Sequence, residues 1–227
     1  MLRYTLTANK IYLNNNMNCI DCKLAKRTIF YAVLTIVLTA LCYNFLDKKV
    51  TDTIYSSDLF GTGINTFASL FSNLFSPKIW AIIIVLATIA CIYKYIKKQQ
   101  SKNLYILSLS LIVTFFVAGT LKVLLARSRP ELWLFDQQFG FHFFSFKSVY
   151  NSMPSGHTTF TFAGLLAIAN FFKNKRITVI AIIVAAIVGV SRILILDHFA
   201  SDILISAYIG TFCYLWSKAF VEHRLTD

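Results

Sequence analysis

Six mostly apolar stretches, each 16 to 23 residues long, limit the folds open to this 227-residue chain more than any other feature. They cover residues 28–46, 79–96, 104–126, 157–172, 177–196 and 199–217. A helix needs roughly 20 apolar residues to cross the hydrocarbon core of a bilayer, and a lipid-exposed strand leaves backbone groups unsatisfied. Only 14% of the residues are charged, against about 25% in soluble domains. The sequence therefore predicts an all-α bundle of six transmembrane helices.

The basic residues indicate how this bundle is oriented, because lysine and arginine gather in cytoplasmic loops. With a cytoplasmic N-terminus, the inner segments carry 14 of the 22 basic residues and the outer segments carry seven of the ten acids. We therefore expect cytoplasmic tails at 1–27 and 218–227 and one membrane domain at 28–217. The net charge of +12 follows mainly from this topology, with attraction to anionic headgroups as a second reading. The basic residues are scattered over separate loops rather than gathered in one stripe, which argues against nucleic-acid binding.

Two long outer loops carry apolar and aromatic residues. In the loop at 47–78, apolar residues recur at three- and four-residue steps, namely Ile64, Phe67, Leu70, Phe71, Leu74 and Phe75. This spacing predicts an amphipathic helix that lies in the membrane interface, either as a lid on the bundle or as a wall for lipid acyl chains. The loop at 127–156 is rich in aromatic residues, which favour the headgroup level.

The five cysteines do not indicate a disulfide scaffold. Cys42, Cys91 and Cys213 fall within predicted spans, where they are small apolar packing residues. Cys19 and Cys22 have the spacing of a redox or zinc half-site, but a closed zinc site needs four ligands and no second pair lies nearby. We interpret this pair as two free cytosolic thiols.

The segment KVLLARSRP, at the outer end of the third span, holds Lys122 and Arg129 seven residues apart. Seven residues are two helical turns, so a continuous helix would place both cations on one face. Pro130 disfavours helical geometry at Arg129, so we expect the helix to end just before it. Taken alone, the segment is equally typical of basic residues that reach toward the headgroups.

The segment PSGHTT, residues 154–159, forms a predicted turn at the start of the fourth span. Pro154 fixes one backbone dihedral, Gly156 adopts conformations closed to other residues, and Ser155 can hydrogen-bond the backbone. Successive backbone N–H groups at a helix start make an anion site, and His157 lies at its mouth. A helix cap with an incidental histidine explains the segment equally well.

The segment SRILILDHFASD joins the fifth and sixth spans. Arg192 lies deep enough in its span to need an anionic partner. His198 and Asp202 are four residues apart and share one face of a helical turn, so the carboxylate can accept the Nδ1–H and leave Nε2 free to attack. A structural Asp–His contact remains the alternative. Asp197 beside His198 also allows a metal site made of Asp197, His198 and Asp202, which the neighbouring cations disfavour.

Together, the three segments supply three cations, a polar turn, two histidines and a carboxylate. Lys122, Arg129 and Arg192 call for a multiply charged anion, and phosphate fits best. Two histidines suit a two-step displacement, one as nucleophile and the other as acid and then base. No Walker A loop is present, so the phosphate is not expected to belong to ATP.

This three-part pattern resembles the signature of the type 2 phosphatidic acid phosphatase superfamily. The matching positions are Lys122, Arg129 and Pro130, then Pro154, Ser155, Gly156 and His157, then Ser191, Arg192, His198 and Asp202. The resemblance implies a reaction without metal or cofactor, in which His198 is the nucleophile, Asp202 orients it and His157 is the general acid and base. It also implies that Lys122, Arg129, Ser155, Gly156 and Arg192 bind the phosphate.

The expected function is that of a lipid phosphatase of the bacterial inner membrane. Its active site is expected at the membrane–water interface on the outer face of that membrane. By analogy, lipid A phosphate or undecaprenyl diphosphate is the favoured substrate, and phosphatidylglycerophosphate or phosphatidic acid comes next. The same phosphohistidine would serve a phosphotransferase that passes the group to another lipid. A lipid transporter or scramblase with a cationic headgroup pocket is a further alternative, although internal repeats and interrupted helices are not evident.

Overall fold

The computed structural model describes residues 2–57 and 63–225, with side chains from residue 22 onward, and these residues form helices without a strand. The helices are α1 (Leu2–Phe45), α2 (Asp47–Ser56), α3 (Gly63–Asn73), α4 (Pro77–Ile96), α5 (Lys102–Leu125), α6 (Pro130–Asp136), the short 3-10 helix η1 (Ser148–Tyr150), α7 (Gly156–Phe172), α8 (Lys175–Leu194) and α9 (Ala200–Arg224). Over this part of the chain the all-α prediction is confirmed.

Five segments of the described chain are long and apolar enough to cross a membrane. They are Cys22–Phe45, Gly63–Ile96, Lys102–Leu125, Lys175–Leu194 and Ala200–Arg224. The remaining predicted span, at 157–172, corresponds to α7, which has only 17 residues, so the count of six spans stays a prediction. Outward-facing side chains such as Phe30, Leu86 and Ile183 are exposed, as expected for helices that meet lipid.

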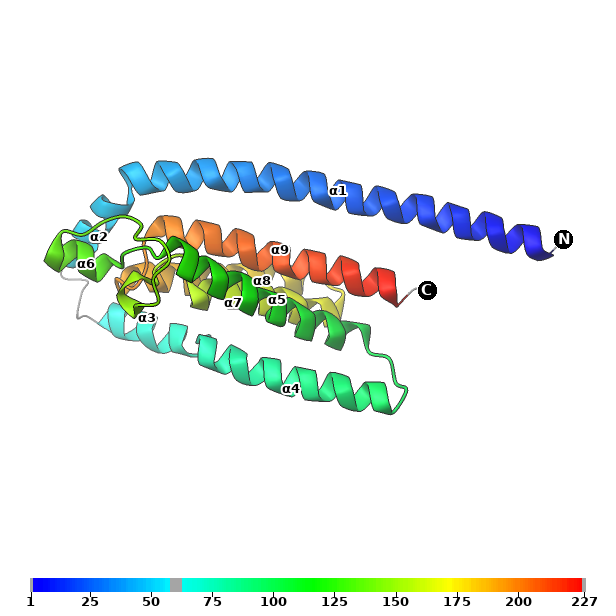
Figure 1. Ribbon diagram of the computed structural model, residues 1–227. Coiled ribbons are helices and arrows are strands. Elements are labelled where there is room, and N and C mark those ends of the chain that lie inside the picture. Colours follow the sequence, from blue (N-terminus) through cyan, green and yellow to red (C-terminus); the bar gives the residue numbers. More distant parts are fainter. Residues whose placement is uncertain (1, 58–62, 226–227) are drawn as a thin grey trace.

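The helices form an elongated bundle in which α7 is the central element. It packs against α5, α8 and α9, while α1 packs on α9, α4 on α5 and α3 on α8. Figure 1 shows the C-terminal end of α9 and the N-terminal end of α1 at the same end of the bundle, with α2, α3 and α6 at the other. The loop-rich end is the one that carries all three motifs.

Glycines let the helices around α7 approach closely. A Cβ atom added at Gly210 of α9 would lie 2.3 Å from the backbone oxygen of Thr159 in α7. A Cβ atom at Gly164 of α7 would lie 2.1 Å from the ring of Trp80 in α4. Glycine therefore sets the spacing of the helices that carry the motifs, as small residues commonly do between membrane helices.

The loop at 47–78 contains two helices, α2 and α3. The predicted amphipathic helix corresponds to α3, which exposes Ile64, Phe67, Leu70 and Leu74 on one side. On its other side, Ser72 is buried and accepts a hydrogen bond from Arg192 of α8 at 3.0 Å. A helix packed on the bundle at this position is confirmed, whereas its placement in a membrane interface stays a prediction. Residues 58–62 of the loop lie outside the described residues.

The cysteines lie largely where the sequence predicted. Cys91 and Cys213 are buried between helices, and Cys42 is half-buried in α1. Cys22 is an exposed free thiol, while the side chain of Cys19 lies outside the described part of the chain.

Candidate active site

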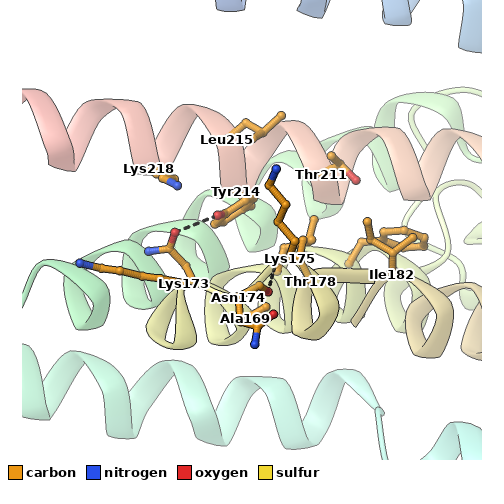
Figure 2. A pocket seen from close by; sticks show the side chains of 13 residues that line it. Ala169, Lys173, Asn174, Lys175, Thr178, Ile182, Thr211, Tyr214, Leu215 and Lys218 are labelled. Atoms are coloured by element: carbon orange, nitrogen blue, oxygen red, sulfur yellow. Dashed lines mark hydrogen bonds between the residues drawn. The ribbon is translucent and has the colours of Figure 1, made fainter. Parts of the chain in front are cut away.

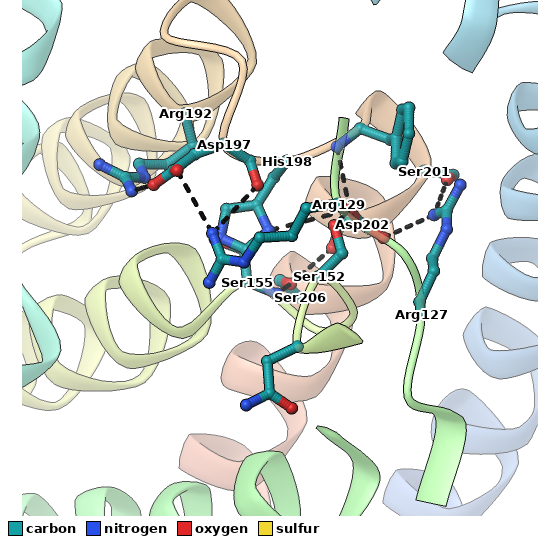
Figure 3. A network of polar contacts seen from close by, with 12 residues as sticks. Arg127, Arg129, Ser152, Ser155, Arg192, Asp197, His198, Ser201, Asp202 and Ser206 are labelled. Carbon is teal, nitrogen blue, oxygen red and sulfur yellow. Dashed lines mark hydrogen bonds and ion pairs between the residues drawn. The ribbon is translucent and has the colours of Figure 1, made fainter. Parts of the chain in front are cut away.

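The three motifs meet at one end of the bundle, although 80 residues of sequence separate Lys122 from Asp202. The first follows α5, the second begins α7, and the third joins α8 to α9. Figure 3 shows Arg129, Arg192, Asp197, His198 and Asp202 gathered in one network of polar contacts. The structure thus brings together the residues that the sequence analysis singled out.

The end of α5 holds the first cation of the site. The helix stops at Leu125 because Ala126 adopts a left-handed conformation with a φ of 44°, which confirms that the helix ends before Arg129. Lys122 stays within the last turn, and its Nζ donates to the backbone oxygen of Asn151 at 2.6 Å. This bond ties α5 to the segment that leads into the PSGH turn.

Arg129 and Arg192 share one carboxylate, that of Asp197. Arg129 Nη1 lies 3.3 Å from Asp197 Oδ1, and Arg192 Nη2 forms an ion pair with Asp197 Oδ2. Each carboxylate oxygen therefore faces a different guanidinium group. The pair of arginines can accordingly hold an anion that offers two oxygens, which is the geometry in which guanidinium groups bind phosphate. Asp197 points to these cations rather than toward a metal-ligand cluster with His198 and Asp202.

The PSGH turn lies at the N-terminus of α7, as predicted. His157 is in the first turn of α7, near enough to His198, Arg192 and Lys122 to be influenced by their charges, so the structure brings both histidines to the same end of the bundle. The backbone N–H of Ser155 donates to Ser206 Oγ of α9 at 2.7 Å. This N–H is therefore directed to α9 in the structure, and its predicted role in binding phosphate, like that of Gly156, stays a prediction.

His198 is buried just before α9, with 3% of its side chain exposed. Its Nδ1 lies 3.8 Å from Asp202 Oδ2, which is too long for a hydrogen bond, and Nδ1 has no hydrogen-bond partner among the described residues. Burial lowers the pKa of the His198 imidazole to about 4, although Asp202 opposes this shift. The ring is therefore neutral at pH 7, and a neutral ring has the free lone pair that a nucleophile requires.

We expect the protein to lose stability as the pH falls from about 6.5 to about 4. In the unfolded chain His198 takes up a proton near 6.5, but in the folded protein its pKa is about 4 because it is buried. Within this window the unfolded state binds more protons, so each pH unit lowers the free energy of unfolding by at most about 1.4 kcal/mol. Thermal unfolding in detergent at about pH 7 and about pH 5 measures the loss. A His198→Gln variant should show a smaller loss, and an equal loss would contradict this origin.

The carboxylate of Asp202 accepts three hydrogen bonds. Its Oδ2 accepts from Ser152 Oγ at 2.6 Å and from the backbone N–H of Phe199 at 2.9 Å. Its Oδ1 accepts from Arg127 Nη1 at 2.5 Å. These contacts fix the carboxylate so that Oδ2 faces the His198 ring, which fits the orienting role predicted for it.

Several residues of this network were missed by the sequence analysis, namely Asp47, Arg127, Ser152 and Ser201. Arg127 lies inside the quoted KVLLARSRP segment, but nothing in its spacing distinguishes it from a basic residue of an outer loop. An arginine directly after an apolar span is a signal that a buried acidic partner exists. The identity of that partner required the fold.

A separate cavity of about 530 Å³ lies at the opposite end of the bundle, between α7, α8 and α9. Figure 2 shows Lys173, Lys175 and Lys218 around it, together with Asn174 and Tyr214. None of the motif residues lines it. It is therefore distinct from the cluster of histidines and arginines. Among the described residues, no three or more His, Cys, Asp or Glu side chains are grouped so as to hold a metal ion.

Similarity to known proteins agrees with this geometry. The Lipid A 1-phosphatase of Rhizobium johnstonii is 31% identical over 126 residues, which cover 52% of this chain and 51% of that protein. Lipid phosphate phosphatase 2 of Arabidopsis thaliana is 28% identical over 174 residues, which cover 60% of each chain. The chain thus spans only about half to three fifths of the length of these curated relatives.

The fold is similar to that of a crystallised transmembrane PAP2 type phosphatidylglycerolphosphate phosphatase from Bacillus subtilis. The TM-score is 0.65 at 18% sequence identity, and the match covers 86% of this chain and 96% of that chain. The sequence model of the PAP2 superfamily matches residues 103–225, more than half of the chain. Because this segment contains every signature position, from Lys122 to Asp202, the protein belongs to the PAP2 superfamily.

Proposed function

We propose that the protein is a lipid phosphatase that hydrolyses a phosphate ester or diphosphate of a membrane lipid through a phosphohistidine. The observation that carries this proposal is a buried His198 whose Nδ1 faces Asp202 Oδ2 at 3.8 Å, next in sequence to Asp197, whose carboxylate pairs with Arg129 and Arg192. A neutral nucleophile beside cations that hold two oxygens of one anion is what attack on phosphorus requires.

In the first step, Nε2 of His198 attacks phosphorus and forms an N–P bond. The P–O bond to the lipid breaks, and its electron pair goes to the leaving oxygen, which takes a proton from a cationic His157 and leaves that ring neutral. As the His198 ring becomes cationic, a small approach of Asp202 from its 3.8 Å separation completes a hydrogen bond with the Nδ1–H. The negative charge on the phosphoryl oxygens is stabilised by Arg129 and Arg192, a large contribution in transfers of this type.

In the second step, His157 accepts a proton from water while the water oxygen attacks phosphorus. The N–P bond breaks, its electron pair returns to His198, and inorganic phosphate leaves. Side chains thus supply the nucleophile, the proton transfers and the charge stabilisation, which supports a reaction without metal. Lys122 adds a third cation to the site, held near it by its bond to Asn151.

The substrate we favour is lipid A phosphate or undecaprenyl diphosphate, followed by phosphatidylglycerophosphate and phosphatidic acid. The names of the relatives support phosphate esters of lipids as a class, and helices long and apolar enough to span a membrane support a substrate that lies in the bilayer. We further propose a bacterial inner-membrane location with cytoplasmic tails and a site that faces the periplasm.

A panel of these four lipids, offered to the purified protein in detergent with excess chelator, tests the proposal by release of inorganic phosphate. We expect release from at least one lipid, undiminished by the chelator. A labelled donor offered with an acceptor lipid separates hydrolysis, with label in free phosphate, from transfer, with label on the acceptor. Lipid movement across vesicles without any release would instead favour a scramblase.

A further inference from the structure

Arg127 is fully buried between two carboxylates from distant parts of the chain. Its Nη2 lies 2.7 Å from Asp47 Oδ2, and its Nη1 lies 2.5 Å from Asp202 Oδ1. All three side chains have 0% exposure. The guanidinium carbon also lies 4.6 Å from the Phe199 ring centre and 5.0 Å from that of Tyr43. These ion pairs are therefore shielded by aromatic rings, and charges in such surroundings interact strongly.

Asp47 connects the first outer helix to the start of α9. It begins α2, and its Oδ1 accepts the backbone N–H of Ser201 at 3.0 Å. Its Oδ2 accepts the hydroxyl of Ser201, and that hydroxyl in turn accepts from Arg127 Nη1 at 2.5 Å. Figure 3 shows Arg127 directed at Ser201 and Asp202. Asp47 lies outside residues 103–225, the segment that the superfamily model matches.

The charges of this cluster decide how much negative charge faces His198. A single arginine paired with Asp202 alone would neutralise it. Because two carboxylates share the one guanidinium group, the cluster of Asp47, Arg127 and Asp202 keeps a net charge of one negative. Asp202 Oδ2 is the oxygen that faces His198 Nδ1, so this excess charge lies where the imidazole becomes cationic during attack.

We propose that Asp47 and Arg127 are positioning residues for the reaction. Arg127 fixes the Asp202 carboxylate, and Asp47 balances Arg127 so that Asp202 keeps its charge for His198. This inference rests on the proposed function, because it requires a cationic His198 in the first step. The inference gives Asp47, which lies before the matched residues 103–225, a direct part in the site.

The test compares phosphate release by four purified proteins on the lipid that the wild type hydrolyses best. Asp47→Asn keeps the shape of the side chain and removes its charge. Arg127→Gln with Asp47→Asn removes both charges and restores the net charge of the cluster to that of the wild type. Asp52→Asn is the matched control, because Asp52 is also an α2 carboxylate but bonds to Trp133 Nε1 outside this cluster.

We expect Asp47→Asn to lower kcat about 10- to 100-fold with KM unchanged, the range typical of lost partners of a ligand-orienting group. The double variant should regain part of that loss and stay within about tenfold of wild-type kcat, because coupled charges are not additive. The control should match the wild type. A residue with a merely structural role would lower the amount of folded protein without this split between kcat and KM.

If the Asp47→Asn variant has the same kcat as the wild type, the inference is overturned but the proposed function is not. A double variant slower than Asp47→Asn would have the same consequence. If Asp47→Asn fails to fold because the buried Arg127 loses one of its two carboxylate partners, the double variant still tests the charge balance, since Asp202 keeps its hydrogen bonds from Ser152 and Phe199. No phosphate release by the wild type from any lipid would overturn both the inference and the proposed function.

Discussion

Replacing His198 by alanine is expected to abolish phosphate release, with a loss of about 10⁴-fold or more, the scale seen when a covalent nucleophile is removed. The protein should stay folded for two reasons that the structure provides. His198 Nδ1 has no hydrogen-bond partner among the described residues, so truncation leaves no new unpaired group on a neighbour. The backbone N–H of His198, which donates to Arg192 at 3.3 Å, is retained.

Two measurements make this result specific. With a lipid substrate labelled at phosphorus, the wild type should carry acid-labile, base-stable label on the protein, and His198→Ala should carry none. His223→Ala is the matched control, because His223 lies in the last turn of α9, at the other end of the helix that begins beside His198. Full activity in His198→Ala would refute its assignment as nucleophile, and equal losses in both variants would indicate a general effect on folding.

Replacing Gly210 by alanine is expected to be the most damaging single-methyl change in the bundle. The added Cβ atom would lie 2.3 Å from the Thr159 backbone oxygen and 2.8 Å from Phe162 Cβ. Neither neighbour can turn away, because one is backbone and the other is attached directly to it. α7 and α9 must therefore separate, at a cost of about 1–3 kcal/mol or more. The shift also moves His157 relative to Asp202, so activity should fall together with stability.

Gly119→Ala provides the matched control for this change. Gly119 lies in α5, and a Cβ atom added there meets nothing within 4 Å. Alanine is favoured over glycine in a helix by about 0.5–1 kcal/mol, so this variant should be as stable as the wild type or more stable. Thermal unfolding in detergent and phosphate release measure both outcomes. A Gly210→Ala protein as stable and active as Gly119→Ala would show that the two helices are not held at contact distance.

Much of this architecture was predictable because it depends on local pattern. The apolar stretches gave both ends of α4, α5, α7 and α8 to within a few residues, since a membrane helix must be apolar along its length. They did not give the start of α1, which lies 26 residues before the predicted stretch, or the end of α9, which lies seven residues after it. Two helix boundaries could also be predicted from the sequence. Pro130 disfavours helix at Arg129, beyond the end of α5, and Gly156 lies where α7 begins. The catalytic candidates were found because lysine, arginine and histidine are conspicuous at the ends of apolar spans.

What the sequence could not supply are partners chosen by tertiary packing. Asp47 and Arg127 are 80 residues apart and belong to different predicted segments, so no spacing rule joins them. Ser155 illustrates the same limit at shorter range. Its N–H appeared free to bind an anion, but Ser206, one helix away, accepts it. A pattern identifies which groups need partners, and the fold decides which partners they receive.

The short central helix has a consequence for the membrane itself. At 1.5 Å per residue, the 17 residues of α7 extend about 26 Å, whereas the hydrocarbon core of a bilayer is about 30 Å thick. In the predicted six-span arrangement, with Lys173 at the level of one headgroup layer, His157 would lie a few ångströms below the opposite layer. Either the bilayer thins around the bundle or the substrate phosphate descends to the site. In the proposed phosphatase, the thickness of the surrounding lipid would thus be a variable of catalysis, set by the length of one helix.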